Sequence, residues 1–356
     1  MKQEKVNKRI ISFEATLVQA LKQMDLVDCK LLLVYKEDLF YSIISIGDIQ
    51  RAIIKGIDLS ERLDTILRKN ITLGHEHHTV AELKELMQKY RMEFLPILNG
   101  NRELKEVLFW EELFGPEEHA VAALHVPVVI MAGGKGTRLK PITNIIPKPL
   151  IPIGDKPIIE LITDSFVKVG VTNFFVSVNY KKEMIIRYYE ELADKNYRMQ
   201  YFTETKPLGT GGSLHLLKNK LKETFFVTNC DILIKQDYAD ILEYHRQHKN
   251  EITMVAAIKH YSIPYGTVET GIGGSLTSFK EKPEIQFLVN AGMYILEPHL
   301  LGEIPDNTFF HITDLIEKVK NRNGNVGVFP VSEGAWMDIG EWKEYNKTVA
   351  RLGFDK

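Results

Sequence analysis

Residues 128–150 combine an apolar run, closely spaced glycines and basic side chains, a pattern typical of a buried strand that leads into a phosphate-binding loop. The glycines and cations are Gly133, Gly134, Gly136, Arg138 and Lys148. Backbone N–H groups approach phosphate oxygens closely only where side chains are absent, which the glycines provide. Arginine as a planar fork and lysine as a point charge stabilise negative charge that develops during phosphoryl transfer. The stretch is therefore predicted to bind a polyphosphate.

Two familiar phosphate-binding motifs fit this stretch less well. A Rossmann fingerprint needs a glycine where Leu139 stands, and a Walker A loop ends in Gly-Lys-Ser/Thr. A glycine-rich surface loop without function is the remaining alternative. The stretch instead resembles the signature of sugar-1-phosphate nucleotidyltransferases, G-G-x-G-T-R-L-x-P-x-T followed by P-K-P-L. The matching residues are Gly133, Gly134, Gly136, Thr137, Arg138, Leu139, Pro141, Thr143, Pro147, Lys148, Pro149 and Leu150.

Strands and helices alternate from Pro127 onward, which predicts an α/β domain with a parallel sheet. We expect helices at 158–166 and 182–192, and strands at 174–178 and 199–203. The resemblance implies a Rossmann-like (GT-A-like) nucleotidyltransferase domain with a mixed, mostly parallel sheet over residues 127–356. It also implies that the nucleotide is held by Ala132, Gly133, Gly134, Gly136 and Thr137.

A second glycine-rich turn, residues 204–213, follows the strand predicted at 199–203. Ligands of open α/β sheets bind beyond the carboxyl ends of the strands, so both turns should face one crevice. In the resembled family this turn lies against base and ribose, which implies contacts from Pro207, Gly209 and Thr210. Glu204 accepts hydrogen bonds and donates none, so it suits the N1–H and exocyclic amine of guanine better than uracil or thymine. The alternative is that Glu204 points to solvent.

Two aspartates end apolar segments far apart in the chain. Asp231 follows the run 225–229, and Asp338 precedes Ile339 and Gly340. Mg²⁺ that bridges phosphates is commonly held by one or two carboxylates. The resemblance implies that both aspartates bind this metal, although Cys230 replaces the family's usual glycine. Alone, Asp231 could be an ordinary turn residue.

Between the aspartates lie Glu281-Lys282-Pro283 and Val289 to Tyr294, which resemble the family's E-K-P and V-N-A-G-x-Y segments. The resemblance implies that Lys282 binds the sugar phosphate, and that sugar contacts come from Glu281, Asn290 and Gly292. Paired donors and acceptors suit a polyol.

The predicted reaction is attack of a sugar 1-phosphate oxygen on the α-phosphorus of an NTP, which releases pyrophosphate and forms an NDP-sugar. Arg138, Lys148 and Lys282 are the predicted catalytic residues, with GTP and a hexose or hexosamine 1-phosphate as substrates. One alternative is a GT-A glycosyltransferase, although residues 229–231 are not an Asp-x-Asp motif. The other is a non-catalytic adenosine-nucleotide sensor.

Residues 1–115 contain an internal duplication, in which 63 positions separate the helix start at Thr16 from that at Thr79. Residues 44–51 resemble the strand, hydroxyl, glycine, aspartate and helix pattern of cystathionine-beta-synthase-type (CBS) domains. That resemblance implies a tandem pair in which Ser45 and Asp48 contact an adenosine nucleotide. The alternative makes Asp48 a helix N-cap in a docking or dimerisation module. The expected divisions are 1–62, 63–118, a linker at 119–126 and 127–356.

The run 75–78, His-Glu-His-His, is predicted to be a solvated connector and not a metal site. Adjacent histidines on a loop are not expected to share a face, and no later Cys/His cluster completes a coordination shell.

Composition is that of an ordinary soluble protein, with 44% hydrophobic and 26% charged residues over 356 positions. The net charge of −2 argues against nucleic acid as a partner. No apolar stretch predicts a membrane span or signal peptide, and two cysteines suit a cytoplasmic location. A CBS pair joined to this transferase resembles bacterial enzymes for surface glycans and nonulosonic acid precursors. It implies a homo-oligomer and favours glucosamine 1-phosphate or its N-acetyl form over mannose 1-phosphate.

Overall fold

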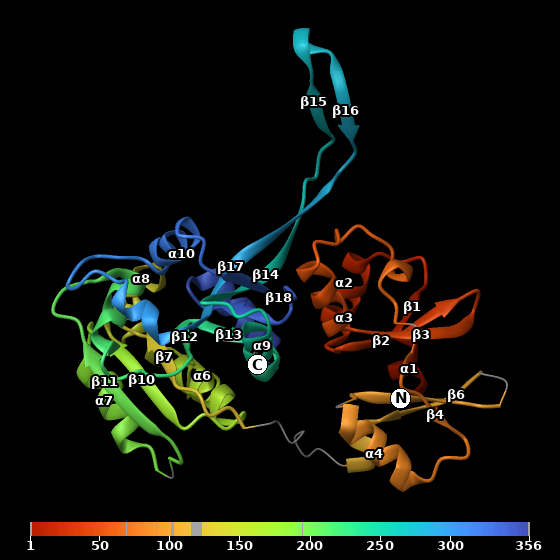
Figure 1. The fold of residues 1–356 in the computed structure, drawn as a ribbon, viewed down its shortest axis with the longest axis horizontal. Coiled ribbons are helices and arrows are strands. Elements are labelled where there is room, and N and C mark those ends of the chain that lie inside the picture. The colour runs from red at the N-terminus through yellow and green to blue at the C-terminus, as the bar shows by residue number, and fades with distance from the viewer. Residues whose placement is uncertain are drawn as a thin grey trace. The chain divides into compact units, whose positions relative to one another are not determined.

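The computed structural model describes residues 2–68, 70–90, 92–100, 103–114, 123–193 and 195–354. The chain divides into two compact units, Met1–Ala120 and Val121–Lys356 (Figure 1). Residues 119–122 of the predicted linker lie outside the described residues. Within them, no helix is both long and apolar enough to cross a membrane.

The N-terminal unit repeats one arrangement of helices and strands twice. Its elements are α1 (Lys2–Asn7), β1 (Ile10–Ser12), α2 (Leu17–Val27), β2 (Leu31–Lys36), β3 (Leu39–Ser45), α3 (Ile46–Ile54), β4 (Gly74–His75), α4 (Val80–Tyr90), β5 (Phe94–Leu98), β6 (Leu104–Phe109) and α5 (Trp110–Phe114). They form two three-stranded sheets, β1-β2-β3 and β4-β5-β6. In each sheet the first pair of strands is parallel and the second antiparallel.

The two sheets of this unit share one apolar core. Leu33 and Ile43 from the first sheet cluster with Phe94, Val107 and Phe109 from the second. A three-stranded sheet of this size cannot bury its own apolar face, so packing of one copy against the other stabilises both.

The start of helix α3 contradicts the alternative in which Asp48 is the N-cap residue. Ser45 is the N-cap, and Asp48 is its partner three residues later in a capping box. The Asp48 carboxylate also accepts hydrogen bonds from Arg51 at 2.6 Å and Arg68 at 2.9 Å. Burial opposes ionisation, but the hydrogen bonds from Ser45 and the two arginines lower the pKa of Asp48. The N-cap assignment was therefore wrong by three residues.

The C-terminal unit is built on one large sheet. Its main elements are β7 (Val128–Met131), α6 (Ile158–Val167), β10 (Asn173–Val178), α7 (Lys182–Glu191), β11 (Arg198–Thr203), α8 (Gly209–Gly212), β12 (Phe225–Asn229), β13 (Ile232–Ile234), α9 (Tyr238–Gln247), β14 (Ile252–Ser262), β15 (Thr267–Thr270), β16 (Leu276–Lys280), β17 (Glu284–Leu296), α10 (Ile312–Asn321), β18 (Val326–Val331), β19 (Trp336–Asp338) and α11 (Trp342–Arg351). Short elements between these are the strands β8 (Pro152–Ile153) and β9 (Lys156–Pro157) and the 3-10 helices η5 (Ser213–Leu217) and η7 (Pro298–Gly302).

Seven strands form this sheet in the order β11-β10-β7-β12-β17-β14-β18. Strand β17 is antiparallel to both of its neighbours, and the other pairs are parallel. The mixed, mostly parallel sheet expected from the sequence is thus confirmed. Strands β7, β10, β11 and β12 point the same way, so the loops after them meet at one edge.

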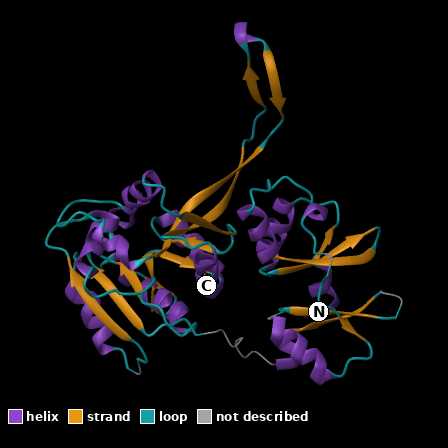
Figure 2. Cartoon of the chain, viewed as in Figure 1, coloured by secondary structure: helices purple, strands orange, loops and turns teal. Residues whose placement is uncertain are grey.

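Alternation of side chains along β7 explains the two layers of helices that cover the sheet (Figure 2). Val128 and Ile130 face a core completed by α6, α7 and α9. Val129 faces the opposite core, which includes η5, η7 and α10. Because successive side chains of a strand point to opposite faces, an uninterrupted apolar run is required for a sheet covered on both sides.

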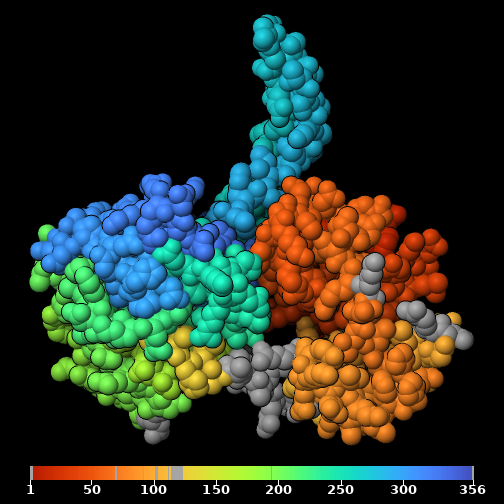
Figure 3. Space-filling view, in the orientation of Figure 1, coloured from red at the N-terminus to blue at the C-terminus, as the bar shows by residue number. Residues whose placement is uncertain are grey.

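An arm extends from the ends of β14 and β17 and carries the two-stranded sheet of β15 and β16 (Figures 1 and 3). Val268 and Phe279 lie opposite each other in this hairpin, and their side chains are about 60% and 58% exposed. The arm therefore presents an apolar surface to solvent.

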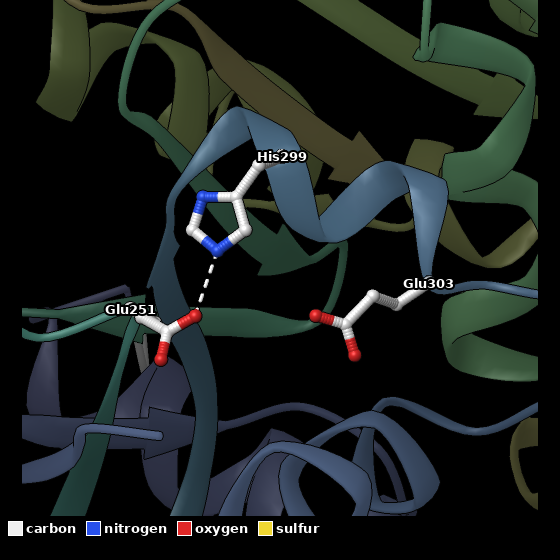
Figure 4. A group of neighbouring side chains, drawn as sticks. All are labelled: Glu251, His299 and Glu303. Carbon is white, nitrogen blue, oxygen red and sulfur yellow. Dashed lines mark hydrogen bonds and ion pairs between the residues drawn. The ribbon is translucent and has the colours of Figure 1, made fainter. Parts of the chain in front are cut away.

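Two clusters outside the sheet edge contain residues of the types that bind metals. The imidazoles of His75, His77 and His78 have centroids 4.8 to 5.4 Å apart, so the premise that they do not share a face was wrong. Among the described residues, however, the group whose ligand atoms converge is Glu251, His299 and Glu303 (Figure 4).

Arg322 pairs with both carboxylates of this second group. Its Nη1 lies 2.9 Å from Glu251 Oε1, and its Nη2 lies 2.7 Å from Glu303 Oε1. His299 Nε2 lies 2.7 Å from the other Glu251 oxygen. These bonds connect the start of β14, helix η7 and the end of α10, so the group is a structural ion-pair network. Hydrogen bonds from Arg322 lower the pKa of Glu251 to about 2.

The stabilisation from this network should depend on pH. Since the pKa of Glu251 in the folded protein lies below its ordinary 4.5, its contribution is complete above that value and is lost as the pH falls towards about 2. Arg322→Ala should therefore lower the unfolding temperature at neutral pH, with a difference from wild type that shrinks on acidification through this window. Arg187→Ala, which removes an exposed 4.0 Å pair with Glu191, is the control. A difference that stays constant with pH would contradict the assignment.

Candidate active site

A cleft of about 430 Å³ lies at the edge of the sheet where β7, β10, β11 and β12 end. Its lining comes from the loops that follow these strands, together with residues from two later segments. The lining residues are Met131, Gly133, Gly134, Gly136, Thr137, Arg138, Lys148, Asn179, Glu204, Pro207, Gly209, Thr210, Asn229, Cys230, Asp231, Phe309, His311 and Gly340. Both predicted glycine-rich turns therefore line one cleft, as their positions after parallel strands indicate.

The first glycine loop is folded tightly against the segment that carries Lys148. Gly136 has a φ of +63°. A Cβ there would lie 2.8 Å from the Lys148 Cβ and 2.9 Å from Thr143 Cγ2. The Thr143 hydroxyl also donates a 3.0 Å hydrogen bond to the Gly136 carbonyl. Only glycine fits both the backbone conformation and the available space at this position. The absence of a side chain lets Lys148 lie directly beside the loop.

The two predicted metal-binding aspartates are brought together by a short antiparallel pair of strands. Ile232 pairs with Asp338 across β13 and β19, and the Ile339 N–H donates a 2.9 Å hydrogen bond to the Asp231 carbonyl. A Cβ on Gly340 would lie 2.8 Å from Asp338 Oδ1, 3.1 Å from Arg138 Nη2 and 3.3 Å from Asp231 Oδ2. Both carboxylates and the guanidinium therefore surround the same small space.

Opposite charges compensate at this end of the cleft. Lys148 Nζ forms an ion pair with Asp231 Oδ2, and each side chain is 12% exposed. Burial raises the pKa of Asp338, and the negative charge of Asp231 raises it further. Two neighbouring, partly buried carboxylates favour a bound cation. Lys148 supplies one positive charge beside them, which offsets part of their negative charge. The oxygen donors fit Mg²⁺ that also contacts phosphate oxygens.

Glu204 is 8% exposed, so the alternative that it points to solvent is wrong. Its Oε1 accepts a 2.8 Å hydrogen bond from Ser177 Oγ, and its Oε2 accepts a 3.0 Å bond from the Leu208 N–H. Each carboxylate oxygen has a second lone pair, so both can accept a further bond from a ligand. The protein donors fix the orientation of the carboxylate at the wall of the cleft.

The residues predicted to contact the sugar do not lie together. Gly292 is beside the cleft, since a Cβ there would lie 2.7 Å from Asn229 Nδ2. Asn290 accepts a 3.0 Å hydrogen bond from the Gly292 N–H and contacts Tyr294. Glu281 and Lys282 are exposed and lie between β16 and β17, on the arm. They do not line the cleft, and their roles stay predictions.

Several cleft residues were not predicted from the sequence. Asn179 directly follows β10, and this position beyond a strand end was a usable signal. Phe309 and His311 come from the segment before α10, where no motif points to the cleft. Cys230 also lines the cleft, but burial raises the pKa of its thiol to about 12, which argues against a nucleophilic role.

Ala132, in contrast, was predicted to contact the nucleotide. It is fully buried behind the cleft lining, where its N–H donates to the Ser177 carbonyl.

This fold and this cleft define the class of the protein. Residues 127–352 match the Nucleotidyl transferase family, so the chain belongs to that family. The match coincides with the C-terminal unit and includes both glycine-rich turns and both aspartates.

Curated relatives and solved structures are similar to the same part of the chain. It is 32% identical over 229 residues to a probable mannose-1-phosphate guanylyltransferase 1 of Oryza sativa subsp. japonica, a match that covers 61% of this chain and 62% of the relative. A mannose-1-phosphate guanyltransferase of Emericella nidulans is 33% identical, with 61% of each chain covered. The chain thus spans about three fifths of the length of these relatives. HddC from Yersinia pseudotuberculosis is 26% identical with a TM-score of 0.51, over 64% of this chain and 99% of HddC.

Substitution of Gly340 should disrupt the charged end of the cleft. The Cβ of Gly340→Ala would displace Asp338, Arg138 and Asp231 side chains from their positions. Loss of one hydrogen bond to a charged group costs about 1.5–3 kcal/mol, so binding of a magnesium–nucleoside triphosphate should weaken roughly tenfold or more. Gly302→Ala is the matched control, because a Cβ there meets only the end of Lys218, at 3.6 Å or more. Calorimetric titration of both variants checks this, and equal affinities would show that the side chains around Gly340 do not hold the nucleotide.

Proposed function

We propose that the C-terminal unit is a sugar-1-phosphate guanylyltransferase, which converts GTP and a hexose or hexosamine 1-phosphate into a GDP-sugar and pyrophosphate. The observation that carries this proposal is the convergence of Arg138, Asp231 and Asp338 around Gly340, beside the glycine loop. Guanine is supported by the carboxylate of Glu204 in the cleft wall and by the names of the relatives. Those names also put mannose 1-phosphate ahead of glucosamine 1-phosphate as the first sugar to test.

The reaction requires charge stabilisation more than acid–base chemistry. A phosphate oxygen of the sugar 1-phosphate attacks the α-phosphorus, the bond to the β-phosphate oxygen breaks, and pyrophosphate leaves. The attacking oxygen is already anionic, so no side chain has to remove a proton from it. The Arg138 guanidinium is proposed to stabilise the departing pyrophosphate, and Lys148 the attacking and α-phosphates.

Asp231 and Asp338 are proposed to hold Mg²⁺. When bound, the ion would neutralise charge on the phosphate oxygens and help to orient them. Lys148 forms an ion pair with Asp231, so this lysine lies beside a carboxylate that would hold the ion. Asn290 and Gly292 are proposed sugar contacts, because Gly292 adjoins Asn229 in the cleft lining.

The N-terminal unit is proposed to be a tandem CBS pair, with repeats at 1–62 and 63–118. The repeated strand arrangement supports this, as do the Ser45 hydroxyl and Asp48 carboxylate at the start of α3. Arg51 and Arg68 beside Asp48 would offset the charge of an adenosine nucleotide. The alternative of a docking or dimerisation module remains, since these ion pairs also explain Asp48 structurally. A cytoplasmic homo-oligomer that supplies sugars for surface glycans or nonulosonic acids completes the proposal.

Nucleotide preference tests the proposed reaction. Each of the four common NTPs is incubated with mannose, glucose, glucosamine and N-acetylglucosamine 1-phosphates, and pyrophosphate is measured. GTP should give the highest kcat/KM, because guanine alone presents two adjacent donors to Glu204. Preference for UTP or dTTP would refute the guanine assignment, and no pyrophosphate from any pair would refute the reaction.

Arg138→Ala should lower kcat roughly 100- to 1,000-fold, the range seen when one donor to developing charge is removed. The variant should still fold, because Arg138 lies in the cleft lining and not in the core. Arg187→Ala, on the exposed face of α7, is the control and should keep full activity. Normal turnover by a folded Arg138→Ala enzyme would remove this residue from the mechanism.

AMP and ATP binding tests the role of the N-terminal unit. If Ser45 and Asp48 form a nucleotide site, calorimetry should detect binding that Asp48→Asn weakens about tenfold through loss of a charge-assisted hydrogen bond. Wild-type protein that binds neither nucleotide, with activity insensitive to both, would favour the docking role.

A further inference from the structure

One end of the cleft carries an aromatic pair that the predicted motifs leave unexplained. Phe309 and His311 line the cleft, although they lie about 100 residues after the second glycine-rich turn. Phe309 is 59% exposed, and its ring contacts that of His311 edge-on, with centroids 4.8 Å apart and planes at 83°. A large apolar ring exposed in the cleft is an available surface for a ligand.

Backbone hydrogen bonds fix this segment against the glycine-rich turn. The Phe310 N–H donates to the Leu208 carbonyl at 2.9 Å, and its carbonyl accepts from Gly211 and Gly212 at 3.0 and 2.9 Å. The Ile312 N–H donates to Thr210 Oγ1 at 3.2 Å. The segment is therefore held to the turn on both sides of His311, directly after Phe309.

These bonds also decide which way the side chains point. Phe310 packs against the apolar core beneath the sheet. His311 has an extended backbone, and successive side chains of such a segment point to opposite sides. Phe309 and His311, on either side of Phe310, accordingly both line the cleft. The orientation of Phe309 thus follows from the burial of Phe310.

The cleft has two chemically different parts. Arg138, Asp231 and Asp338 gather around Gly340 at one end, which suits phosphates and a metal. Glu204 lines the same cleft beside Gly133; its carboxylate accepts a hydrogen bond from the Leu208 N–H, and the Leu208 carbonyl accepts one from the Phe310 N–H. Glu204 is thus connected through Leu208 to the segment that carries the aromatic pair. A carboxylate and an exposed ring that line the same cleft match a flat heterocycle with hydrogen-bond donors on its edge.

We propose that Phe309 is a specificity-determining residue whose ring stacks on the purine base of the nucleotide, while His311 holds that ring in place. The inference rests on the proposed function and concerns recognition of the face of the base. Glu204, in contrast, is proposed to hydrogen-bond to the edge of the base. A bicyclic purine covers more of the phenyl ring than a pyrimidine does, so stacking adds to the preference for GTP over UTP or CTP.

The test separates the base from the phosphates. Equilibrium binding of GTP and of inorganic tripolyphosphate, each with magnesium, is measured for wild type, Phe309→Ala and Phe309→Tyr. Phe309→Ala should weaken GTP binding roughly 10- to 100-fold, as expected for one lost base–aromatic stack, and leave tripolyphosphate binding unchanged. Phe309→Tyr should bind GTP like wild type. Tyr90→Ala removes a similarly exposed aromatic, 52% exposed, in the other unit and is the control.

Three results would overturn the stacking proposal: unchanged GTP binding in Phe309→Ala, equal weakening of GTP and tripolyphosphate, or the same loss in Phe309→Tyr. The steady-state counterpart is a rise in KM for GTP with kcat nearly unchanged. Wild-type protein that binds GTP normally but releases no pyrophosphate with any sugar phosphate would refute the proposed function alone. Wild-type protein that does not bind GTP would refute both.

Discussion

Repulsion between two carboxylates is the constraint on which the cleft depends. Asp231 and Asp338 approach the same space beside Gly340, where both are partly withdrawn from water. Two negative charges in such a place are stable only with positive partners, and the protein supplies Lys148 as an ion pair and Arg138 close by. The same arrangement favours a ligand that brings a divalent cation together with phosphate anions.

The sheet brings these charged residues together from distant parts of the chain. Parallel strands β7, β10, β11 and β12 end at one edge, so each following loop contributes to the cleft. The β13–β19 pair then places Asp338, more than 100 positions later, beside Asp231. The hydrogen bonds between the second glycine turn and the segment before α10 add Phe309 and His311. The rigid core fixes geometry, and short loops supply the chemistry.

Sequence reasoning succeeded where a local pattern determines the structure. The first glycine loop, Asp231 at a strand end and the alternation of strands and helices each have a signal within about ten residues, and all correspond to the observed cleft or sheet. Capping of α3 was misassigned because both Ser45 and Asp48 are good N-cap residues, and only the backbone decides between them. Phe309 was not predicted to line the cleft, because its position depends on hydrogen bonds to a turn about 100 residues away. Glu281 and Lys282 matched a motif, yet the course of the arm places them outside the cleft.

The fate of the individual phosphates tests the central claim most directly. GTP labelled with ³²P at the α-position or at the γ-position is incubated with mannose 1-phosphate and magnesium, and the products are separated. The account predicts α-label in a sugar nucleotide and γ-label in pyrophosphate, with both products lost in Asp231→Asn. Appearance of γ-label as inorganic phosphate and α-label in GDP would instead indicate simple hydrolysis and contradict the account.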